Sequence, residues 1–424
     1  MRRAVVALVV LAALALLPVA HSASSASPAF GIEDDAWLMY GPGTLSARLS
    51  TLDSLGTRLV RFTVRWDQVA PSRPAAPRDP SDPAYVWGQF DTVLRALHAV
   101  GIQTLVTLYG APRWSNGGHP PNWLPSSGYA DFAYAASKQF PWVHQWTVWN
   151  EPNGRTFSVP VSAKAYVQKL LNPAYASLHQ ASSANVVAGG VTSPRKTPSG
   201  VAPLAFMLGM KAAGARLDAY AHNPYPVSPQ ETPFRSTCTG CAVLTMASLP
   251  SIRADVTRAF GASTPLWLTE YGYQTNPPDR LLGVSYAAQA RYIGQAALRA
   301  WQQPGVTMLI QFLVRDEPSL GGWQSGLFTA GGAAKPALHA FALPLAQVSR
   351  RGGSVVLWGQ VRPGSGARPY VLQRYSGGKW VPLGGTARTD ASGTFARTAT
   401  LPRGSLVRIW AAGAGYASPA LTVS

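Results

Sequence analysis

Eight short apolar runs alternate with longer Ala- and Leu-rich stretches between about residues 30 and 344, and this alternation restricts the possible folds more than any other feature. The runs are typical of β-strands, and the stretches between them are typical of helices. An alternation of strands and helices indicates parallel strands joined by crossover helices. The predicted strands are 29–32, 58–64, 103–108, 145–149, 185–189, 219–222, 266–270 and 307–313, with helices such as 90–100, 163–180 and 286–302 between them.

Eight strand-and-helix units are the number that closes a (β/α)8 barrel, or TIM barrel. An open, doubly wound sheet is the alternative. Such a sheet normally has a glycine-rich, phosphate-binding turn after its first strand. Here the first run continues as Gly31-Ile32-Glu33-Asp34, which is no such turn. We therefore predict an α/β protein with a catalytic barrel over residues 26–345.

The pattern changes at about residue 348, where short strands and turns replace the helices. Predicted strands span residues 355–361, 370–375, 393–399 and 407–411, with Gly, Pro and Ser at the turns between them. This pattern predicts a small antiparallel β-sandwich as an accessory domain over residues 346–424. Carbohydrate binding, cell-wall binding and a spacer role all remain open, because the sequence shows no obvious row of aromatic residues.

The N-terminus has the layout of a secretory signal, with two arginines, an apolar run over residues 4–20 and a patch of small residues. We predict a signal peptide over residues 1–25 and a secreted or extracellular protein, with cell-envelope association as a further option. An uncleaved membrane anchor is the alternative, because the run approaches the length that spans a bilayer. Cys238 and Cys241 are the only cysteines, and in an exported protein they are expected to form a small loop disulfide.

The net charge of +18 is concentrated towards the C-terminus. Residues 346–424 contain ten Lys and Arg residues and one acid, Asp390. Such a charge favours anionic partners, for example acidic polysaccharides or cell-envelope polymers, although it is also explained by solubility alone. Nucleic acid is not an expected partner, since no nucleic-acid motif is present.

Two glutamates end predicted strands at the edge where barrel enzymes place their chemistry. Glu151 closes the fourth strand and Glu270 the seventh. Cleavage of a glycosidic bond needs two carboxyl groups, one to protonate the leaving oxygen and one to attack the anomeric carbon or to activate water. Other acids follow the first and eighth strands: Glu33, Asp34, Asp35, Asp316 and Glu317. Asp316 and Glu317 are adjacent as they leave the eighth strand, so their side chains are expected to point in different directions.

The motifs around these glutamates, Trp-Asn-Glu-Pro-Asn at 149–153 and Thr-Glu-Tyr-Gly at 269–272, resemble those of clan A of the glycoside hydrolases. Arg61 on the second strand, and His222 with Tyr225 after the sixth, match further positions of the clan. The runs 66–71, 85–87 and 111–114 are most similar to family 39 and to bacterial exopolysaccharide hydrolases of that kind, with family 5 as the alternative. The likeness covers roughly residues 30–345.

The resemblance implies a retaining glycoside hydrolase that cleaves β-linked poly- or oligosaccharide without a metal or organic cofactor. Glu151 is then the acid/base and Glu270 the nucleophile, with their carboxyl groups about 5 to 5.5 Å apart. Asn150 is expected to bind a sugar 2-hydroxyl. The other residues expected to bind substrate are Arg61, His222, Tyr225, Trp66, Trp114 and Trp323.

One departure from the clan concerns the eighth strand, which lacks the tryptophan that many members place beneath the sugar. Phe312, Arg315 and Trp323 are the candidates to replace it. The segments 154–160 and 224–241 are expected to shape the cleft. Two other functions remain open: a non-catalytic carbohydrate-binding or envelope-scaffold protein, against which the two glutamates argue, and a transglycosylase, which only product analysis separates from a hydrolase.

Overall fold

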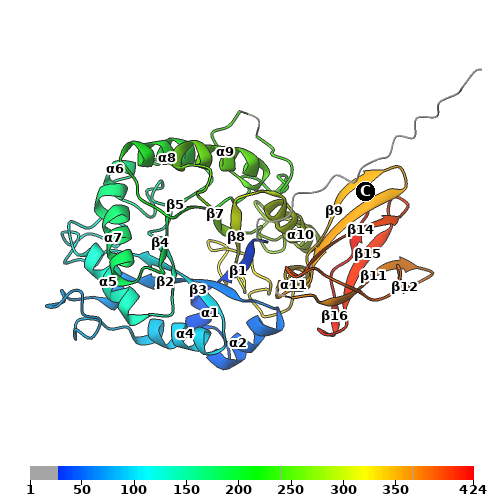
Figure 1. Ribbon diagram of the computed structural model, residues 1–424, viewed down its shortest axis with the longest axis horizontal. Helices are drawn as coiled ribbons and strands as arrows, with labels where there is room; N and C mark the ends of the chain where they lie inside the picture. The colour runs from blue at the N-terminus through cyan, green and yellow to red at the C-terminus, as the bar shows by residue number, and fades with distance from the viewer. Residues whose placement is uncertain (1–26, 239, 365) are drawn as a thin grey trace, which may run out of the picture.

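The computed structural model describes residues 27–238, 240–364 and 366–424, and eight of its strands close into a parallel barrel in chain order (Figure 1). The predicted (β/α)8 architecture is confirmed. The predicted signal peptide lies outside the described residues. The barrel strands are β1 (Ala29–Glu33), β2 (Leu59–Arg65), β3 (Gln103–Tyr109), β4 (Gln145–Val148), β5 (Val186–Thr192), β6 (Ala219–His222), β7 (Leu266–Tyr271) and β8 (Val306–Phe312).

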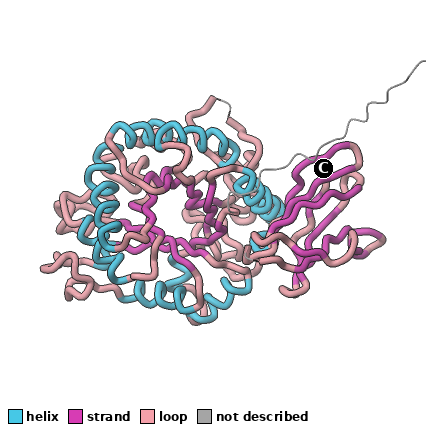
Figure 2. Tube along the Cα trace, viewed as in Figure 1, coloured by secondary structure: helices cyan, strands magenta, loops and turns pink. Residues whose placement is uncertain are grey.

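Helices surround the barrel strands on the outside, as Figure 2 shows. The helix predicted over 163–180 is interrupted by a π-helical turn, η1 (Val167–Leu171). Pro173 follows this turn and has no backbone N–H for the regular α-helical pattern. The helices are α1 (Asp35–Tyr40), α2 (Leu45–Ser54), α3 (Trp66–Val69), α4 (Gly88–Ala99), α5 (Tyr129–Gln139), α6 (Ala163–Tyr166), α7 (Asn172–Ala181), α8 (Pro203–Ala212), η2 (Met246–Ser248), α9 (Leu249–Phe260), α10 (Tyr286–Gln302) and α11 (Pro336–Ala342).

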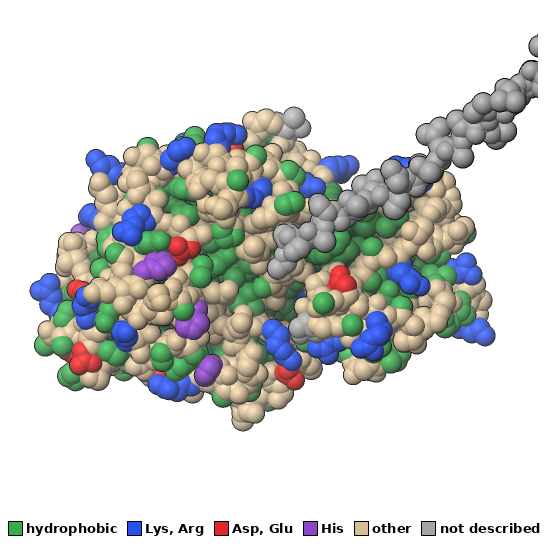
Figure 3. Space-filling view, viewed as in Figure 1, with side chains coloured by type: hydrophobic (Ala, Val, Ile, Leu, Met, Phe, Trp, Pro, Cys, Tyr) green, Lys and Arg blue, Asp and Glu red, His purple; other side chains and the backbone are tan. Residues whose placement is uncertain are grey.

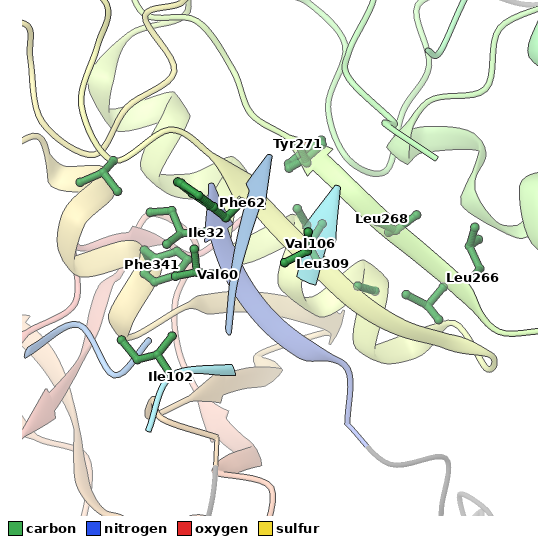
Figure 4. Packing of buried hydrophobic residues seen from close by; sticks show 14 of the residues in the cluster. Ile32, Val60, Phe62, Ile102, Val106, Leu266, Leu268, Tyr271, Leu309 and Phe341 are labelled. Carbon is green, nitrogen blue, oxygen red and sulfur yellow. The ribbon is translucent and has the colours of Figure 1, made fainter. Parts of the chain in front are cut away.

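Successive residues of each barrel strand point alternately to the helices and to the barrel interior. The first set forms the main core between strands and helices; Figure 4 shows part of it, including Val60, Phe62, Val106 and Leu268. The second set fills the lower barrel with a separate apolar cluster that includes Leu59, Leu105, Trp267, Met308 and Ile310. Arg61 lies between two helix-facing residues of β2, so its side chain must enter the barrel above this cluster.

The chain after the barrel forms two antiparallel sheets that pack face to face, which confirms the predicted β-sandwich. Tyr370 of one sheet stacks on Phe395 of the other with ring centroids 4.0 Å apart. The first sheet contains β9 (Leu345–Arg351), β10 (Ser354–Gln360) and β14 (Thr394–Thr400). The second contains β11 (Pro369–Ser376), β12 (Lys379–Pro382), β13 (Ala387–Arg388), β15 (Leu406–Ala411), β16 (Tyr416–Ala417) and β17 (Leu421–Thr422).

The sandwich packs against helix α10 of the barrel. Gly294 permits this close approach, because a Cβ atom there would lie 2.5 Å from the carbonyl oxygen of Leu345. Trp301 of α10 and Trp358 of β10 also pack together, with ring centroids 5.7 Å apart. One hydrophobic core therefore extends from the barrel into the sandwich. Within the described part of the chain, no helix combines the length and the hydropathy needed to cross a bilayer.

Candidate active site

Residues 149–151 leave β4 in an unusual backbone conformation that presents Glu151 at the carboxyl edge of the barrel. Trp149 and Glu151 have φ angles of +69° and +38°, a region that residues other than glycine rarely occupy. The backbone N–H of Glu151 donates to the carbonyl of Val191, itself at φ +44° beside a β-bulge in β5. Each such conformation costs about 1–3 kcal/mol and persists only where the surroundings enforce it, often at functional sites.

The outer residues of the 149–153 motif hold this turn in place. The Trp149 side chain is fully buried, and its indole N–H donates to the carbonyl of Phe157 over 2.6 Å. Asn153 is also fully buried; its amide accepts from the backbone N–H of Ser193 over 2.9 Å and donates to the Ser193 hydroxyl over 3.0 Å. Trp149 and Asn153 are therefore positioning residues for Asn150 and Glu151, which lie between them in the sequence.

Arg61 connects the carboxyl ends of several strands inside the barrel. One of its terminal nitrogens, Nη1, lies 2.5 Å from Oε1 of Glu270 and 2.6 Å from Oε2 of Glu33. The other, Nη2, donates to Oδ1 of Asn150 over 3.0 Å, and Nε donates to the hydroxyl of Thr107 over 2.9 Å. The side chain is 1% exposed, so these buried ion pairs have little screening by solvent.

Both carboxylate oxygens of Glu270 accept hydrogen bonds. Arg61 binds Oε1, and the hydroxyl of Tyr225 donates to Oε2 over 3.0 Å. Both partners stabilise the ionised carboxylate. The residue is 8% exposed. This environment suits a carboxylate that must stay charged in order to attack an electrophile.

Glu151 has the opposite environment, which favours the protonated acid. Its Oε1 accepts one hydrogen bond, from the amide of Asn223 over 3.1 Å, and that amide is oriented by the hydroxyl of Thr269 over 2.8 Å. Burial, and then the negative charge of Glu270, raise the pKa of Glu151 to about 8. Near neutral pH, one glutamate is therefore protonated beside a second that is bound to an arginine and a tyrosine.

Two residues of this site were not selected from the sequence. Glu33 is buried and shares Arg61 with Glu270, and burial raises its pKa well above the usual value although Arg61 opposes the shift. Asn223 provides the hydrogen bond to Glu151. Both positions carried a usable signal, because Glu33 ends the first strand at the same barrel edge and Asn223 directly follows the sixth.

Asn150 and Tyr225 lie at the site as expected, whereas His222 lies beneath it. Both ring nitrogens of His222 are engaged, 2.8 Å from the Thr192 hydroxyl and 2.7 Å from the Leu244 carbonyl, and its side chain is fully buried. Burial lowers the pKa of His222 to about 4, so the ring is neutral. This geometry gives His222 a structural role and does not support the expected contact with substrate.

The structure also does not support the expectation that Trp66 binds sugar. Its ring is fully buried and stacks on Phe132 at 5.4 Å. Trp114 is partly exposed, but its indole N–H donates to the carbonyl of Ala70 and its ring packs edge-on against Trp66. Among the described residues, no contact brings Trp114 against either glutamate. The aromatic residues after β2 and β3 form a cluster that supports their loops.

Trp323 is the expected aromatic residue that does reach the site. Its ring is 37% exposed and lies 4.7 Å from the ring of Tyr225 and 5.6 Å from the ring of Phe312. Tyr225 in turn donates to Glu270. Phe312 and Trp323 thus lie together against Tyr225, whereas Arg315 turns away to bind the carbonyl of Ala330.

The acids that follow β8 have structural roles. Asp316 forms a buried ion pair of 2.7 Å with Lys335 and accepts from the backbone N–H of Gly326. Glu317 accepts from the backbone N–H of Trp323 over 2.6 Å. The two carboxylates therefore hold the loop that carries the tryptophan and do not form a second acid pair.

A cavity of about 350 Å³ adjoins the Arg61 and Asn150 side of the site. Its walls come from the ends of β1, β2 and β3, from helix α1 and from the segment 154–160; they include Glu33, Asp35, Arg65, Tyr109 and Phe157. The other segment expected to shape the cleft, 224–241, begins beside Tyr225, and the disulfide between Cys238 and Cys241 closes its far end. Arg61 and Asn150 connect this cavity to the two glutamates, because Arg61 binds Glu270 and Asn150 precedes Glu151.

Comparison with solved structures shows which known proteins share this fold. A family 39 glycoside hydrolase from Bacteroides cellulosilyticus WH2 superposes with a TM-score of 0.61 at 15% sequence identity, covering 88% of this chain and 81% of that one. A monomeric β-xylosidase from Caulobacter crescentus CB15 gives 0.58 at 15% identity, with 89% and 94% covered. A family 39 enzyme from Xanthomonas axonopodis pv. citri gives 0.54 at 16% identity, with 88% and 92% covered.

Sequence comparison adds no relative, because neither the protein-family models nor the curated proteins that were searched match this chain. The structural matches extend over most of both chains, so they include the barrel as a whole and not an isolated motif. The chain therefore has the fold of the family 39 glycoside hydrolases.

Proposed function

We propose that the protein is a retaining glycoside hydrolase of clan A, related to family 39, that cleaves β-linked poly- or oligosaccharide. The observation that carries the proposal is the pairing of a protonated Glu151 with a Glu270 carboxylate held by Arg61 and Tyr225. Paired carboxyl groups whose environments favour opposite protonation states are typical of an acid and a nucleophile.

In the first step, an oxygen of Glu270 attacks the anomeric carbon while the bond to the leaving oxygen breaks. The proton of Glu151 passes to that oxygen, so the departing sugar leaves as an alcohol. Arg61 and Tyr225 bind the two oxygens of Glu270 and orient the carboxylate before attack. The product of this step is a glycosyl ester on Glu270.

In the second step, the ester is hydrolysed. Ester formation removes the negative charge of Glu270, and with it a cause of the raised pKa of Glu151. Glu151 is ionised at this point, because it has given up its proton, and its carboxylate takes a proton from a water molecule that attacks the anomeric carbon. The carboxylate of Glu270 is released, Glu151 is protonated again, and the anomeric configuration is retained.

The polar and aromatic neighbours of the pair fit a bound sugar. The Asn150 carbonyl oxygen is bound to Arg61, while its amide nitrogen forms no hydrogen bond with the described residues and is available to a sugar 2-hydroxyl. Trp323, supported by Tyr225 and Phe312, offers an apolar ring face beside Glu270. We assign this tryptophan the role of the sugar platform that β8 lacks.

The proposal includes secretion, on the basis of the N-terminal sequence, and an anionic polymer as a partner of the basic C-terminal region. A β-xylosidase among the proteins of the same fold makes β-xylosides reasonable first substrates. Transglycosylation remains a second outcome of the same covalent intermediate, with a sugar in place of water. Product analysis in the presence of an acceptor sugar separates the two reactions.

The test is a screen of plant and bacterial polysaccharides and of aryl β-glycosides, with wild type beside Glu151→Gln and Glu270→Gln. We expect both variants to lose at least about 10²-fold in activity, the lower range for general acid–base catalysis. Asp53→Asn, which changes an exposed acid on α2, is the matched control and should retain full activity. Equal activity of wild type and both glutamate variants would rule out the proposed mechanism.

A further inference from the structure

The outer face of the second sandwich sheet brings together aromatic side chains from three strands. In the antiparallel register, Tyr375 of β11 lies opposite Trp380 of β12, and Val371 of β11 lies opposite Trp410 of β15. Side chains alternate along a strand, so Tyr375, Trp380 and Trp410 share one face. The other face packs into the sandwich core, with buried residues that include Tyr370, Leu372, Val407 and Ile409.

A ring contact and a cation–π contact hold Trp380 among its neighbours on this face. The rings of Tyr375 and Trp380 are 5.3 Å apart, and the guanidinium carbon of Arg408 lies 4.3 Å from the centre of the Trp380 ring. Arg408 also donates from Nε to the side-chain oxygen of Gln373 over 2.8 Å. We call these five residues, Gln373, Tyr375, Trp380, Arg408 and Trp410, the aromatic strip.

The aromatic strip is open to solvent and long enough for a polymer. Tyr375 is 45% exposed, and Trp380 and Trp410 are partly exposed. Trp380 and Trp410 lie on the two strands that flank β11. The β11 residues opposite them, Tyr375 and Val371, are four residues apart along that strand. With strand spacings of about 4.8 Å and a rise of about 3.4 Å per residue, the two tryptophans are separated by roughly 17 Å. A ligand that contacts both must therefore be several sugars long.

The chemistry of the aromatic strip matches a sugar chain that carries negative charge. Flat aromatic rings offer apolar faces to the C–H faces of sugars, and the guanidinium group offers two parallel donors to a carboxylate. Among the described residues, Arg408 forms an ion pair with no carboxylate. Residues 346–424 contain ten basic residues and one acid, and that acid, Asp390, accepts hydrogen bonds from its own turn. Figure 3 shows Lys and Arg side chains spread over the C-terminal part of the surface.

We propose that the aromatic strip binds an anionic polysaccharide of the uronic acid type. The sugar rings pack against Trp410 and the Tyr375–Trp380 pair, and a sugar carboxylate binds the free terminal nitrogens of Arg408. Binding here holds the barrel beside the polymer. The link to cleavage rests on the proposed glycoside hydrolase function, whereas the binding itself does not depend on it.

The experiment is affinity electrophoresis of the full chain through gels that contain polymannuronate, a β-linked uronic acid polymer, or a neutral β-glucan. We expect retardation of the wild type by polymannuronate only. Trp380→Ala combined with Trp410→Ala, and separately Arg408→Gln, should each weaken binding at least tenfold. Arg397→Gln removes the same charge from an exposed position on the other sheet. Tyr134→Ala removes a ring of helix α5 that lies under the Arg78 guanidinium. Both variants should bind within twofold of wild type.

Thermal melting checks that each variant is folded, and Trp380→Phe, which keeps a ring, should retain binding. Glu270→Gln should bind as the wild type does whether or not the wild type hydrolyses the polymer, so failure of the proposed function would leave the binding result unchanged. Equal losses in Arg397→Gln and Arg408→Gln would reduce the interaction to overall charge and overturn the proposal. Absence of retardation in the wild type, or full binding by the double tryptophan variant, would also overturn it.

Discussion

Replacing Glu151 by glutamine tests the protonation state of the proposed site without any need for a substrate. The folded protein raises the pKa of Glu151 to about 8, through burial and then through the charge of Glu270. In an unfolded chain the pKa of a glutamate is about 4.3. Between these values the folded chain binds a proton that the unfolded chain releases. The stability that this group contributes is therefore fully present below about pH 4.3 and is lost as the pH rises towards 8.

The size of the effect follows from the interval between the two pKa values. Each pH unit within it corresponds to about 1.4 kcal/mol. By pH 7 the wild type has thus lost at most about 4 kcal/mol of unfolding free energy, which a glutamine at position 151 does not lose because it does not titrate. The difference in unfolding free energy between Glu151→Gln and wild type should therefore shift in favour of the variant from pH 5 to pH 8.

The assay is thermal unfolding of wild type and Glu151→Gln at pH 5, 6, 7 and 8 at one ionic strength. We expect the melting temperature of the variant, relative to wild type, to rise by several degrees across this range. Asp53→Asn, an exposed acid, should show no such trend. Parallel curves for Glu151→Gln and wild type, or a trend in the opposite direction, would refute the claim that Glu151 is a protonated acid at rest.

Three further predictions concern the neighbours of the glutamate pair. Arg61→Met leaves Glu33 and Glu270 buried without their partner, and it should lower the unfolding free energy by about 3–5 kcal/mol in a melting experiment. Adding Glu33→Gln should restore part of this lost stability. If no stability is recovered, the shared ion pair is contradicted. Asn223→Ala removes a hydrogen bond that lowers the pKa of Glu151, so the alkaline limb of kcat/KM should move to higher pH; a move to lower pH would contradict this account. Trp323→Ala should lower kcat/KM by about tenfold, equal to about 1.4 kcal/mol, whereas Trp114→Ala should stay within twofold; similar losses in both would argue against the platform role.

The barrel could be predicted from sequence because each strand has a local signal. Apolar runs such as 58–64 and 103–108 are distinct from the helical stretches that follow them, and their boundaries differ from β2 and β3 by one residue. Strand β9 was missed; it begins at Leu345, and only Leu343 and Pro344 separate it from the end of α11. The only local mark of the π-helical turn η1 is Pro173, which lies inside the predicted helix 163–180.

Individual site residues were less predictable, because burial and partners depend on the packed barrel. Glu151 and Glu270 were accessible to sequence reasoning, since a lone acid at the end of an apolar strand is a local feature. Trp66 and Trp323 both follow barrel strands, yet one is enclosed by other aromatic rings and the other is exposed beside Tyr225. The aromatic strip was invisible for the same reason, because its rings come from three strands whose register aligns them.

The most direct test of the account is to trap the covalent intermediate. Wild-type protein is incubated with aryl 2-deoxy-2-fluoro-β-glycosides, chosen from the substrates found in the screen, and the labelled peptide is mapped by mass spectrometry. The account predicts one added fluorosugar on Glu270, and no label in Glu270→Gln. A label on Glu151 or Glu33, or release of product with inverted anomeric configuration from the unmodified substrate, would contradict it.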